Sequence, residues 1–478
     1  MRASQNKNTA GKAANGLNHE VELRLTKLLN IFLVAFCFSY SWILYYSHRL
    51  ILSPSLLRSI GIIILFIILY YSFCRVYDAF LISFKRISEL FFSQSLGILM
   101  ADTFMFFTLW LMSDGFPNLL PALLTLAVQL FLSLLWCRYT HMWYFSRFVG
   151  QRTAIVYDER CGIEKLLNQY GLSKRFDVQI VCTIGECQDG DMTMLHEMEA
   201  VFLCGVRSHE RNQILKYCVT NGICAYVIPR IGDVIMSGGK QMHLFHLPLL
   251  RVERYNPPPE FLFVKRLFDI VASATVILLT SPLMLVCAIA VKVQDGGPVF
   301  YRQCRLTKDG REFTILKFRS MRIDAETDGV ARLSTGEDDE RITTVGRCIR
   351  ASRLDELPQL FNILEGSMSV VGPRPERPEI AKQYERELPE FKLRLQAKAG
   401  LTGYAQVYGK YNSGPYDKLQ MDLMYIANPS IIEDLKIIFA TIKILFSKDS
   451  TEGVMKGSTI AKSKVYRKTT EKRELIGS

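Results

Sequence analysis

The chain has 478 residues, too many for one ordinary core, so we expect two or three folded units. Hydrophobic residues make up 49% of the chain and concentrate near its N-terminus, which predicts membrane-spanning segments. The formal net charge of +12 suits a lipid bilayer or phosphorylated substrates; no basic and aromatic run indicates a nucleic-acid partner. Twelve scattered cysteines without a CxxC pair argue against a disulfide framework and against a zinc site.

A polar cytoplasmic tail, residues 1–27, precedes a predicted transmembrane domain of four helices, residues 28–140. Each apolar run is near the roughly 20 residues that a helix needs to cross hydrocarbon. The four runs are residues 28–46, 56–74, 91–112 and 119–137. Lysine and arginine occur in the tail, in the loop after the second run and after the fourth run, so the positive-inside rule places these segments in the cytoplasm.

The next segment, residues 150–250, is predicted to be a Rossmann-like α/β domain. Four short apolar runs predict buried parallel strands, with helical segments such as residues 210–220 between them. The runs are "TAIVY" (153–157), "FDVQIVCTI" (176–184), "AVFLC" (200–204) and "ICAYVI" (223–228). The first turn reads "YDERCG" and lacks the glycines that cradle a phosphate, so a structural or regulatory role is favoured over nucleotide binding.

A fifth apolar run follows the stiff linker "NPPPE" and gives a predicted membrane helix over residues 260–294. Ser281 and Pro282 stand at its centre. Proline removes one helical hydrogen bond and kinks the helix, and a neighbouring serine hydroxyl can satisfy the freed carbonyl. Lysine and arginine flank the run on both sides, which indicates that both ends are cytoplasmic. We therefore expect a re-entrant helix that dips into the inner leaflet and returns; the alternative is a simple kinked span.

The remainder, residues 295–478, is predicted to be a mainly helical α+β catalytic domain. Its acidic segment, residues 324–341, is expected to be a solvated surface loop. Residues 433–446 have an amphipathic pattern, typical of a helix that lies on the bilayer or of one that packs into the core.

The segment "SRLDELPQLFNILEGSMSVVGPRPE", residues 352–376, carries the candidate chemistry. Its apolar residues recur at helical spacing, and Pro358 suits a first helical turn, which puts Asp355 near the N-cap. Side chains of adjacent helical residues point about 100° apart, so Asp355 and Glu356 should have distinct roles. An ionised aspartate is a competent nucleophile toward phosphorus, and a neighbouring carboxylate suits Mg²⁺. The alternative is an N-capping aspartate beside a solvated glutamate.

Cationic side chains cluster around this pair in the sequence, as expected of a site that recognises a diphosphate. They include Lys317, Arg319, Arg353 and Arg374. Pro373 and Pro375 fix the backbone on either side of Arg374, so its guanidinium can bind an oxyanion at little ordering cost. The alternative is a structural turn with a surface arginine.

From about residue 265 to residue 446 the chain resembles the bacterial sugar transferase family of monotopic phosphoglycosyl transferases. The matching blocks are "KRLFDI", "DGGPVFYRQCRL", "FTILKFRSM", "RITTVGRCIRASRLDELPQLFNILEGSMSVVGPRPE", "AGLTGYAQVYG" and "LMYIANPSIIEDLKII". The whole architecture looks like the large-subunit branch of that family. The resemblance implies a re-entrant helix broken at Ser281-Pro282, an aspartyl nucleophile at Asp355, and Glu356 as its dyad partner and Mg²⁺ ligand.

The resemblance further implies phosphate or nucleotide binding by Lys317, Arg319 and Arg374, and a multi-pass protein of the bacterial inner membrane with a cytoplasmic catalytic domain. The expected reaction moves a sugar 1-phosphate from a UDP-sugar to undecaprenyl phosphate and releases UMP, through an aspartyl phosphosugar. Two alternatives remain: a Mg²⁺-dependent glycosyltransferase that releases UDP, and an inactive membrane scaffold or regulator. The sequence leaves open the sugar and the oligomeric state, a homodimer included.

Overall fold

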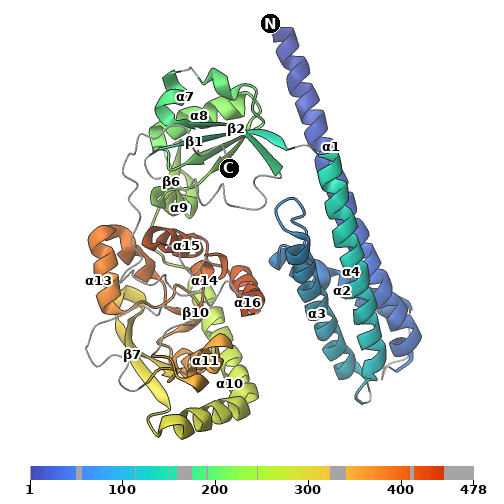
Figure 1. Ribbon diagram of the computed structural model, residues 1–478, viewed down its shortest axis with the longest axis vertical. Helices are drawn as coiled ribbons and strands as arrows, with labels where there is room; N and C mark the ends of the chain where they lie inside the picture. The colour runs from blue at the N-terminus through green and yellow to red at the C-terminus, as the bar shows by residue number, and fades with distance from the viewer. Residues whose placement is uncertain are drawn as a thin grey trace. The chain divides into compact units, whose positions relative to one another are not determined.

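A computed structural model describes residues 2–49, 56–113, 115–148, 150–158, 175–189, 192–244, 246–322, 341–409 and 414–445. The chain forms two compact units, which divide between Ile228 and Pro229 (Figure 1). The acidic loop expected at 324–341 lies outside the described residues, except for Arg341.

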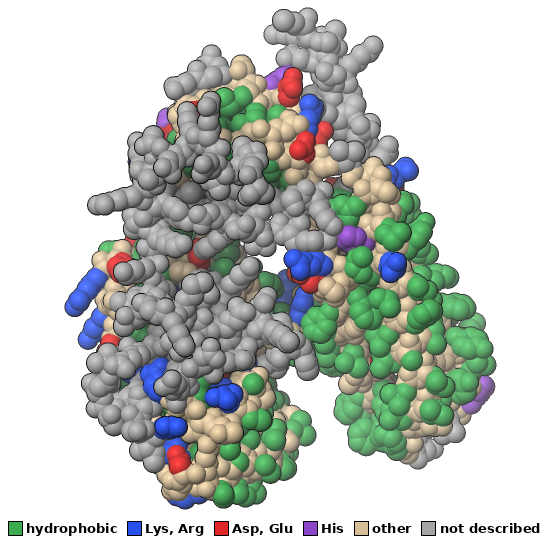
Figure 2. Space-filling model, viewed as in Figure 1, with side chains coloured by type: hydrophobic (Ala, Val, Ile, Leu, Met, Phe, Trp, Pro, Cys, Tyr) green, Lys and Arg blue, Asp and Glu red, His purple; other side chains and the backbone are tan. Residues whose placement is uncertain are grey.

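Four long helices begin the first unit, and each contains one of the expected apolar runs. They are α1 (Arg2–Ser41), which continues as a π-helical turn to Tyr46, α2 (Leu56–Val76), α3 (Ile87–Met112) and α4 (Leu119–Arg147). With α10 of the second unit, they make five helices in the described part of the chain that are long and apolar enough to cross a membrane. Figure 2 shows hydrophobic side chains gathered on the visible face of the N-terminal helices, as expected of a surface that lipid covers.

Four polar side chains inside this helical group, those of Asn30, Tyr70, Gln94 and Ser133, are hydrogen-bonded to one another. Gln94 of α3 accepts hydrogen bonds from Asn30 of α1 (3.3 Å) and Ser133 of α4 (2.5 Å), and its amide donates to the carbonyl of Ala79. Tyr70 of α2 donates to Asn30 (2.7 Å). Since a bilayer offers no water, such pairs link the helices and satisfy groups that would otherwise be costly to bury.

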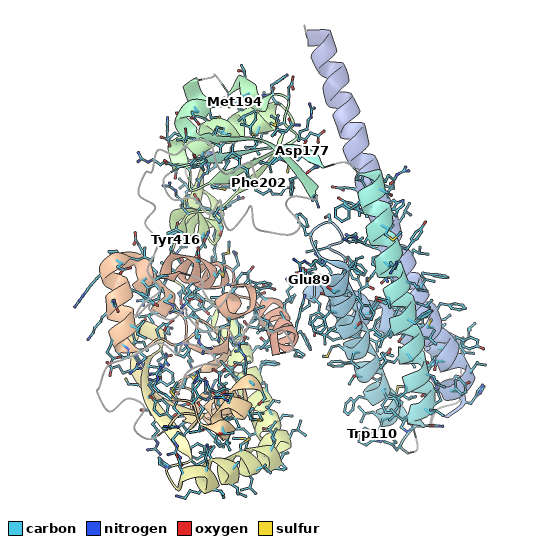
Figure 3. The ribbon with its side chains drawn as sticks, viewed as in Figure 1. Glu89, Trp110, Asp177, Met194, Phe202 and Tyr416 are labelled. Carbon is cyan, nitrogen blue, oxygen red and sulfur yellow. The ribbon has the colours of Figure 1, made fainter. Side chains whose placement is uncertain are left out.

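A four-stranded parallel sheet completes the first unit, as the apolar runs predicted. Its strands are β1 (Gln151–Tyr157), β2 (Phe176–Thr183), β3 (Ala200–Cys204) and β4 (Cys224–Val227), in the order β2-β1-β3-β4. Helices α7 (Ile184–Asp189) and α8 (Ser208–Thr220) contribute Cys187 and Ile214 to one core. Phe202 belongs to an aromatic cluster on the opposite face (Figure 3). The turn expected after β1 lies largely outside the described residues, and its sequence, "YDERCG", has no G-x-G-x-x-G motif.

The second unit starts with a segment that packs into its core. Helix α9 (Ile231–Ser237) lies on α15 (Pro415–Ala427), and Val234 joins the apolar cluster that includes Leu419 and Leu423. The Gln420 amide donates to the carbonyl of Pro229 (2.5 Å). A hairpin follows, made of β5 (Lys240–Leu244) and β6 (Leu247–Arg251).

The long apolar helix α10 (Pro259–Asp295) contains the expected Ser281-Pro282 pair, and Figure 1 shows a bend in its ribbon. Pro282 cannot donate to the carbonyl of Leu278, four residues back, and the Ser281 hydroxyl donates to that carbonyl instead (2.9 Å). The prediction that the serine compensates for the proline is therefore confirmed.

Both halves of α10 are attached to the same unit. In its first half, Arg266 donates to the carbonyls of Ile363 and Leu364 (2.6 and 2.7 Å), and Asp269 accepts from the amide of Val370 (3.0 Å). In its second half, Met284, Cys287 and Val291 pack against Phe318 and Ile349.

The rest of the second unit is mainly helical with two small sheets. Strands β7 (Phe300–Leu306) and β8 (Glu312–Phe318) are antiparallel, and β9 (Ser369–Val371) is parallel to β10 (Gly400–Thr402). The helices are α11 (Thr344–Ala351), α12 (Gln359–Glu365), α13 (Pro378–Glu387), the 3₁₀ segment η6 (Pro389–Gln396), α14 (Tyr404–Tyr408), α15 and α16 (Ile431–Leu445). The Asn362 side chain of α12 binds the backbone of Thr314 and Leu316, which fixes α12 against β8.

Helix α16 covers the segment expected to be amphipathic, up to Leu445; residue 446 is outside the described residues. Ile437 is fully buried in the cluster that contains Val234, so one face of α16 packs into the core. Core packing, one of the two alternatives, is therefore confirmed for this face. Ile432 is 68% exposed, and contact of α16 with a bilayer stays a prediction.

Candidate active site

Asp355 and Glu356 lie in a short 3₁₀ turn, η5 (Leu354–Glu356), between α11 and α12. Arg353 enters this turn with a left-handed backbone (φ 53°), which ends the path of α11. Pro358, not Asp355, is the N-cap of α12. Asp355 lies three residues before this N-cap, in the turn that precedes the helix, so the alternative of an N-capping aspartate is wrong. Leu354 and Leu357 hold the turn by packing against Phe318 and Ile349.

Two cations from distant parts of the chain meet at Glu356. Lys317 Nζ of β8 lies 3.1 Å from Glu356 Oε1, and Arg374 Nη2 lies 3.2 Å from the same oxygen. Burial alone would raise the pKa of Glu356. The positive charges of Lys317, Arg374 and Arg353 outweigh burial and hold this pKa well below its ordinary value. Glu356 is therefore ionised at neutral pH.

Asp355 differs from its neighbour. No described side chain donates a hydrogen bond to its carboxylate, which is only partly exposed. Burial and the negative charge of Glu356 raise the pKa of Asp355 to about 6, despite the cations nearby. At neutral pH the aspartate is thus ionised, and none of the described side chains donates a hydrogen bond to it. This is the state that a nucleophile requires.

Hydrogen bonds to four consecutive backbone carbonyls, those of residues 373–376, fix the backbone around Arg374. The carbonyl of Pro373 accepts from the Gly400 amide (2.9 Å), and that of Arg374 accepts from Arg394 Nη2 (2.9 Å). The carbonyl of Pro375 accepts from Arg305 Nη1 (3.0 Å), and that of Glu376 from the Leu306 amide (3.0 Å). The two prolines therefore stand in a segment that is held by hydrogen bonds as well as by ring geometry.

Gly372, just before this segment, has no room for a side chain. A Cβ atom there would lie 2.2 Å from the Lys398 carbonyl oxygen. The close approach of these two segments of the chain therefore requires glycine at position 372.

The four cationic residues predicted for the site differ in their position relative to Glu356. Lys317 and Arg374 contact Glu356, and Arg353 begins the turn that carries the dyad. Arg319 instead forms an ion pair with Asp295 at the end of α10. Its Nη1 atom is buried and has no hydrogen-bond partner among the described residues.

The sequence reasoning missed a buried group of charges behind Arg374. Arg394 and Asp422 are 3% and 1% exposed and are paired at 2.7 Å, and Arg394 also lies 3.5 Å from Glu376. Nearby cations, against the effect of burial, hold the pKa of Glu376 below its ordinary value. Of these three residues, only Glu376 could have been predicted from the local sequence, because it directly follows Pro375. Arg394 and Asp422 are far in sequence from the segment that carries Asp355 and Arg374.

The donor set fits Mg²⁺ bound together with a substrate. Among the described residues there is no group of three or more histidine, cysteine, aspartate or glutamate side chains that could hold a metal. Mg²⁺ commonly uses one or two carboxylates, with waters and substrate phosphates as its other ligands. Asp355 and Glu356 offer two such carboxylates, and the described cations form hydrogen bonds with one of the two Glu356 oxygens. The expected Mg²⁺ site stays a prediction.

Comparison with known proteins gives the family. Residues 261–448 match the model of the bacterial sugar transferase family. A UDP-glucose:undecaprenyl-phosphate glucose-1-phosphate transferase of Caulobacter vibrioides is 40% identical over 191 residues, which are 39% of this chain and 71% of that protein. The chain belongs to the bacterial sugar transferase family.

The names of two further relatives specify other sugars, N-acetylgalactosamine and galactose. A UDP-N-acetylgalactosamine-undecaprenyl-phosphate N-acetylgalactosaminephosphotransferase of Aeromonas hydrophila is 37% identical over 50% of this chain and 56% of its own length. An undecaprenyl-phosphate galactose phosphotransferase of Salmonella typhimurium is 39% identical over 42% of this chain and 44% of its own length. These matches span about half of the relatives' length.

Proposed function

We propose that this protein transfers a sugar 1-phosphate from a UDP-sugar to undecaprenyl phosphate, with release of UMP. The observation that carries the proposal is the unequal state of two adjacent carboxylates. Glu356 is engaged by Lys317 and Arg374, whereas the Asp355 carboxylate accepts no hydrogen bond from the described side chains. The names of the relatives support the two substrates, and no single sugar is common to them.

In the first step, an Asp355 oxygen attacks the phosphorus that is bonded to the sugar. The bond between this phosphorus and the bridging oxygen of the diphosphate breaks, and UMP leaves with that oxygen. Arg374 and Lys317 face the same region as Glu356 and can stabilise charge on the diphosphate oxygens. The result is an aspartyl phosphosugar, a mixed anhydride on the protein.

In the second step, a phosphate oxygen of undecaprenyl phosphate attacks the phosphorus of the aspartyl phosphosugar. The bond to Asp355 breaks, the carboxylate is regenerated, and the product is an undecaprenyl diphosphate sugar. Glu356 and Asp355 would hold Mg²⁺, which neutralises diphosphate charge when bound. Two successive displacements let a soluble donor and a membrane acceptor use one site in turn.

The attachment of both halves of α10 to one unit supports a re-entrant helix. A straight helix of 37 residues would be about 55 Å long, well beyond a bilayer core of about 30 Å. Arg266 and Val291, near opposite ends of α10, nevertheless both contact the catalytic unit. A crossing would put these contacts on opposite sides of the membrane. We therefore infer a helix that returns to the cytoplasmic face of the inner membrane and holds the dyad near the lipid phosphate.

Cysteine labelling from the two sides of the membrane tests this topology. Cys224 precedes α10 and Cys304 follows it, and both are exposed. A membrane-impermeant maleimide should label both in permeabilised cells and neither in intact cells. Phe116→Cys, placed in the exposed loop between α3 and α4, should be labelled in intact cells. Labelling of Cys304 but not Cys224 in intact cells would instead establish a fifth crossing.

Nucleotide release tests the reaction. Purified protein in detergent, with Mg²⁺, undecaprenyl phosphate and UDP-glucose, UDP-galactose or UDP-N-acetylgalactosamine, should release UMP from a preferred donor. Release should require the lipid and should be abolished by Asp355→Asn. UDP as the product would indicate a glycosyltransferase, and no nucleotide from a broad panel of UDP-sugars would favour a scaffold.

A further inference from the structure

Arg394 is a buried arginine whose nitrogens are all directed at the protein. Its Nε and Nη2 atoms lie 2.8 and 2.7 Å from Asp422 Oδ2, and its Nη1 atom lies 3.5 Å from Glu376. Nη2 also donates to the backbone carbonyl of Arg374 at 2.9 Å. The guanidinium lies over the ring of Phe391, and the side chain is only 3% exposed. Arg394 is therefore placed to act on other residues and not on a substrate.

Asp422 provides the fixed end of this arrangement. It belongs to α15, where its neighbours Leu419 and Leu423 are buried in the apolar core. A carboxylate that is 1% exposed needs a charged partner, and Arg394 is that partner. Since the helix is held by its core packing, the position of the Arg394 guanidinium is set by α15.

Arg374 is the other end of the arrangement. Its side chain, which is 42% exposed, reaches Glu356 Oε1 at 3.2 Å. Its backbone carbonyl is the group that Arg394 holds. Asp422, Arg394, Arg374 and Glu356 thus form a continuous chain of polar contacts from the core of the unit to the dyad.

We propose that Arg394 is a positioning residue for the transfer reaction: it fixes the backbone of Arg374 and thereby places the Arg374 guanidinium against the donor diphosphate. The inference rests on the proposed function. Lysine cannot replace this arginine, because a single ammonium cannot bind Asp422 and the Arg374 carbonyl with the same planar geometry. A small displacement of Arg374 should reduce the rate strongly, since groups that stabilise a phosphoryl-transfer state depend on position.

A double-mutant cycle on UMP release tests this role. We expect Arg394→Lys to lower kcat/KM for the UDP-sugar by about 10- to 100-fold when Arg374 is present. In the Arg374→Ala background the same change should lower it by less than about twofold, because the side chain that Arg394 positions is gone. Equal factors in both backgrounds would mean a general structural role and would overturn the inference.

One further variant controls for a general loss of stability, and another replaces Arg394→Lys if that variant does not fold. Ile437→Val removes a methylene from the same core without touching Arg374, so it should reduce stability and leave kcat/KM of the folded protein unchanged. If Arg394→Lys does not fold, Asp422→Asn replaces it in the cycle, with the same two expected factors. Absence of UMP release by the wild-type protein would overturn the proposed function and this inference with it, whereas UMP release with equal factors would overturn the inference alone.

Discussion

Arg374 and Glu356 are 18 residues apart in sequence, yet Arg374 Nη2 lies 3.2 Å from Glu356 Oε1, the same oxygen that Lys317 approaches. The pairing keeps Glu356 ionised and occupies one of its two oxygens. The remaining oxygen and the carboxylate of Asp355 can then face a cation and a phosphate. Two cations of the site thus contact one carboxylate of the pair, and none of the described side chains donates a hydrogen bond to the other.

Glu356→Gln should weaken the dependence of the rate on Mg²⁺. The amide keeps an oxygen for Lys317 and Arg374 but loses the charge that attracts Mg²⁺. We expect the Mg²⁺ concentration for half-maximal UMP release to rise by about tenfold or more. Glu379→Gln is the matched control, since Glu379 is an exposed residue of α13 that pairs with Arg377. A Mg²⁺ titration that is the same for both variants would argue against a ligand role for Glu356.

Asp355→Asn should stabilise the fold at neutral pH while it abolishes turnover. The pKa of Asp355 is raised from 3.8 to about 6, so folding disfavours its charged form. The resulting loss of stability is present above pH 6 and disappears below pH 4, where the group is protonated in both states. The variant should therefore be more stable by about 1–3 kcal/mol at pH 7.5 and no more stable at pH 4.

Thermal unfolding in detergent at the two pH values measures this difference. Equal stability of Asp355→Asn and the wild-type protein at pH 7.5 would show that the aspartate is not held in an unfavourable ionised state. The same titration predicts that kcat/KM, measured at low Mg²⁺, falls as the pH decreases through about 6, because the nucleophile takes up a proton.

Ser281→Ala tests the compensation for Pro282 in α10. Loss of the hydroxyl leaves the carbonyl of Leu278 without a donor in an apolar environment, which should cost about 1–3 kcal/mol. The double variant Ser281→Ala, Pro282→Ala regains a backbone amide for that carbonyl and should recover part of the loss. Thr280→Ala is the control, because Thr280 donates to Val276, whose carbonyl already has a helical partner. Thermal unfolding in lipid nanodiscs compares the variants; no recovery in the double variant would contradict the prediction.

Local patterns in the sequence were enough to predict many of the helices and strands. Apolar length predicted the helices now seen as α1 to α4, and short apolar runs predicted the strands of the sheet. A proline after a serine predicted the contact between Ser281 and Leu278, since that contact lies within one helical turn. In the site, the cationic residues Lys317 and Arg374 were predicted from their density around the dyad, and both contact Glu356.

Other features depend on contacts between residues far apart in sequence and leave no local pattern. Arg353 adopts a left-handed backbone that glycine would have signalled, so the extra turn before α12 was not expected. The pair of Arg394 and Asp422 forms only when η6 and α15 come together. Arg319 follows the last residue of β8, Phe318, and pairs with Asp295 at the end of α10, a partner 24 residues earlier in the sequence.

Val234→Ala tests the assignment of α9 to the catalytic unit. Val234 is 2% exposed and packs with residues of α15, so removal of its two methyl groups should reduce the free energy of unfolding by about 2 kcal/mol. Met236→Ala on the same helix is the control: Met236 is 50% exposed, and its loss should cost less than about 0.5 kcal/mol. Hydrogen exchange shows which elements the substitution destabilises. Val234→Ala should increase exchange in α9 and α15 and leave β1 to β4 unchanged, because the segment after Ile228 belongs to the core that carries Asp422. Faster exchange in the sheet, with α15 unaffected, would instead attach α9 to the α/β domain.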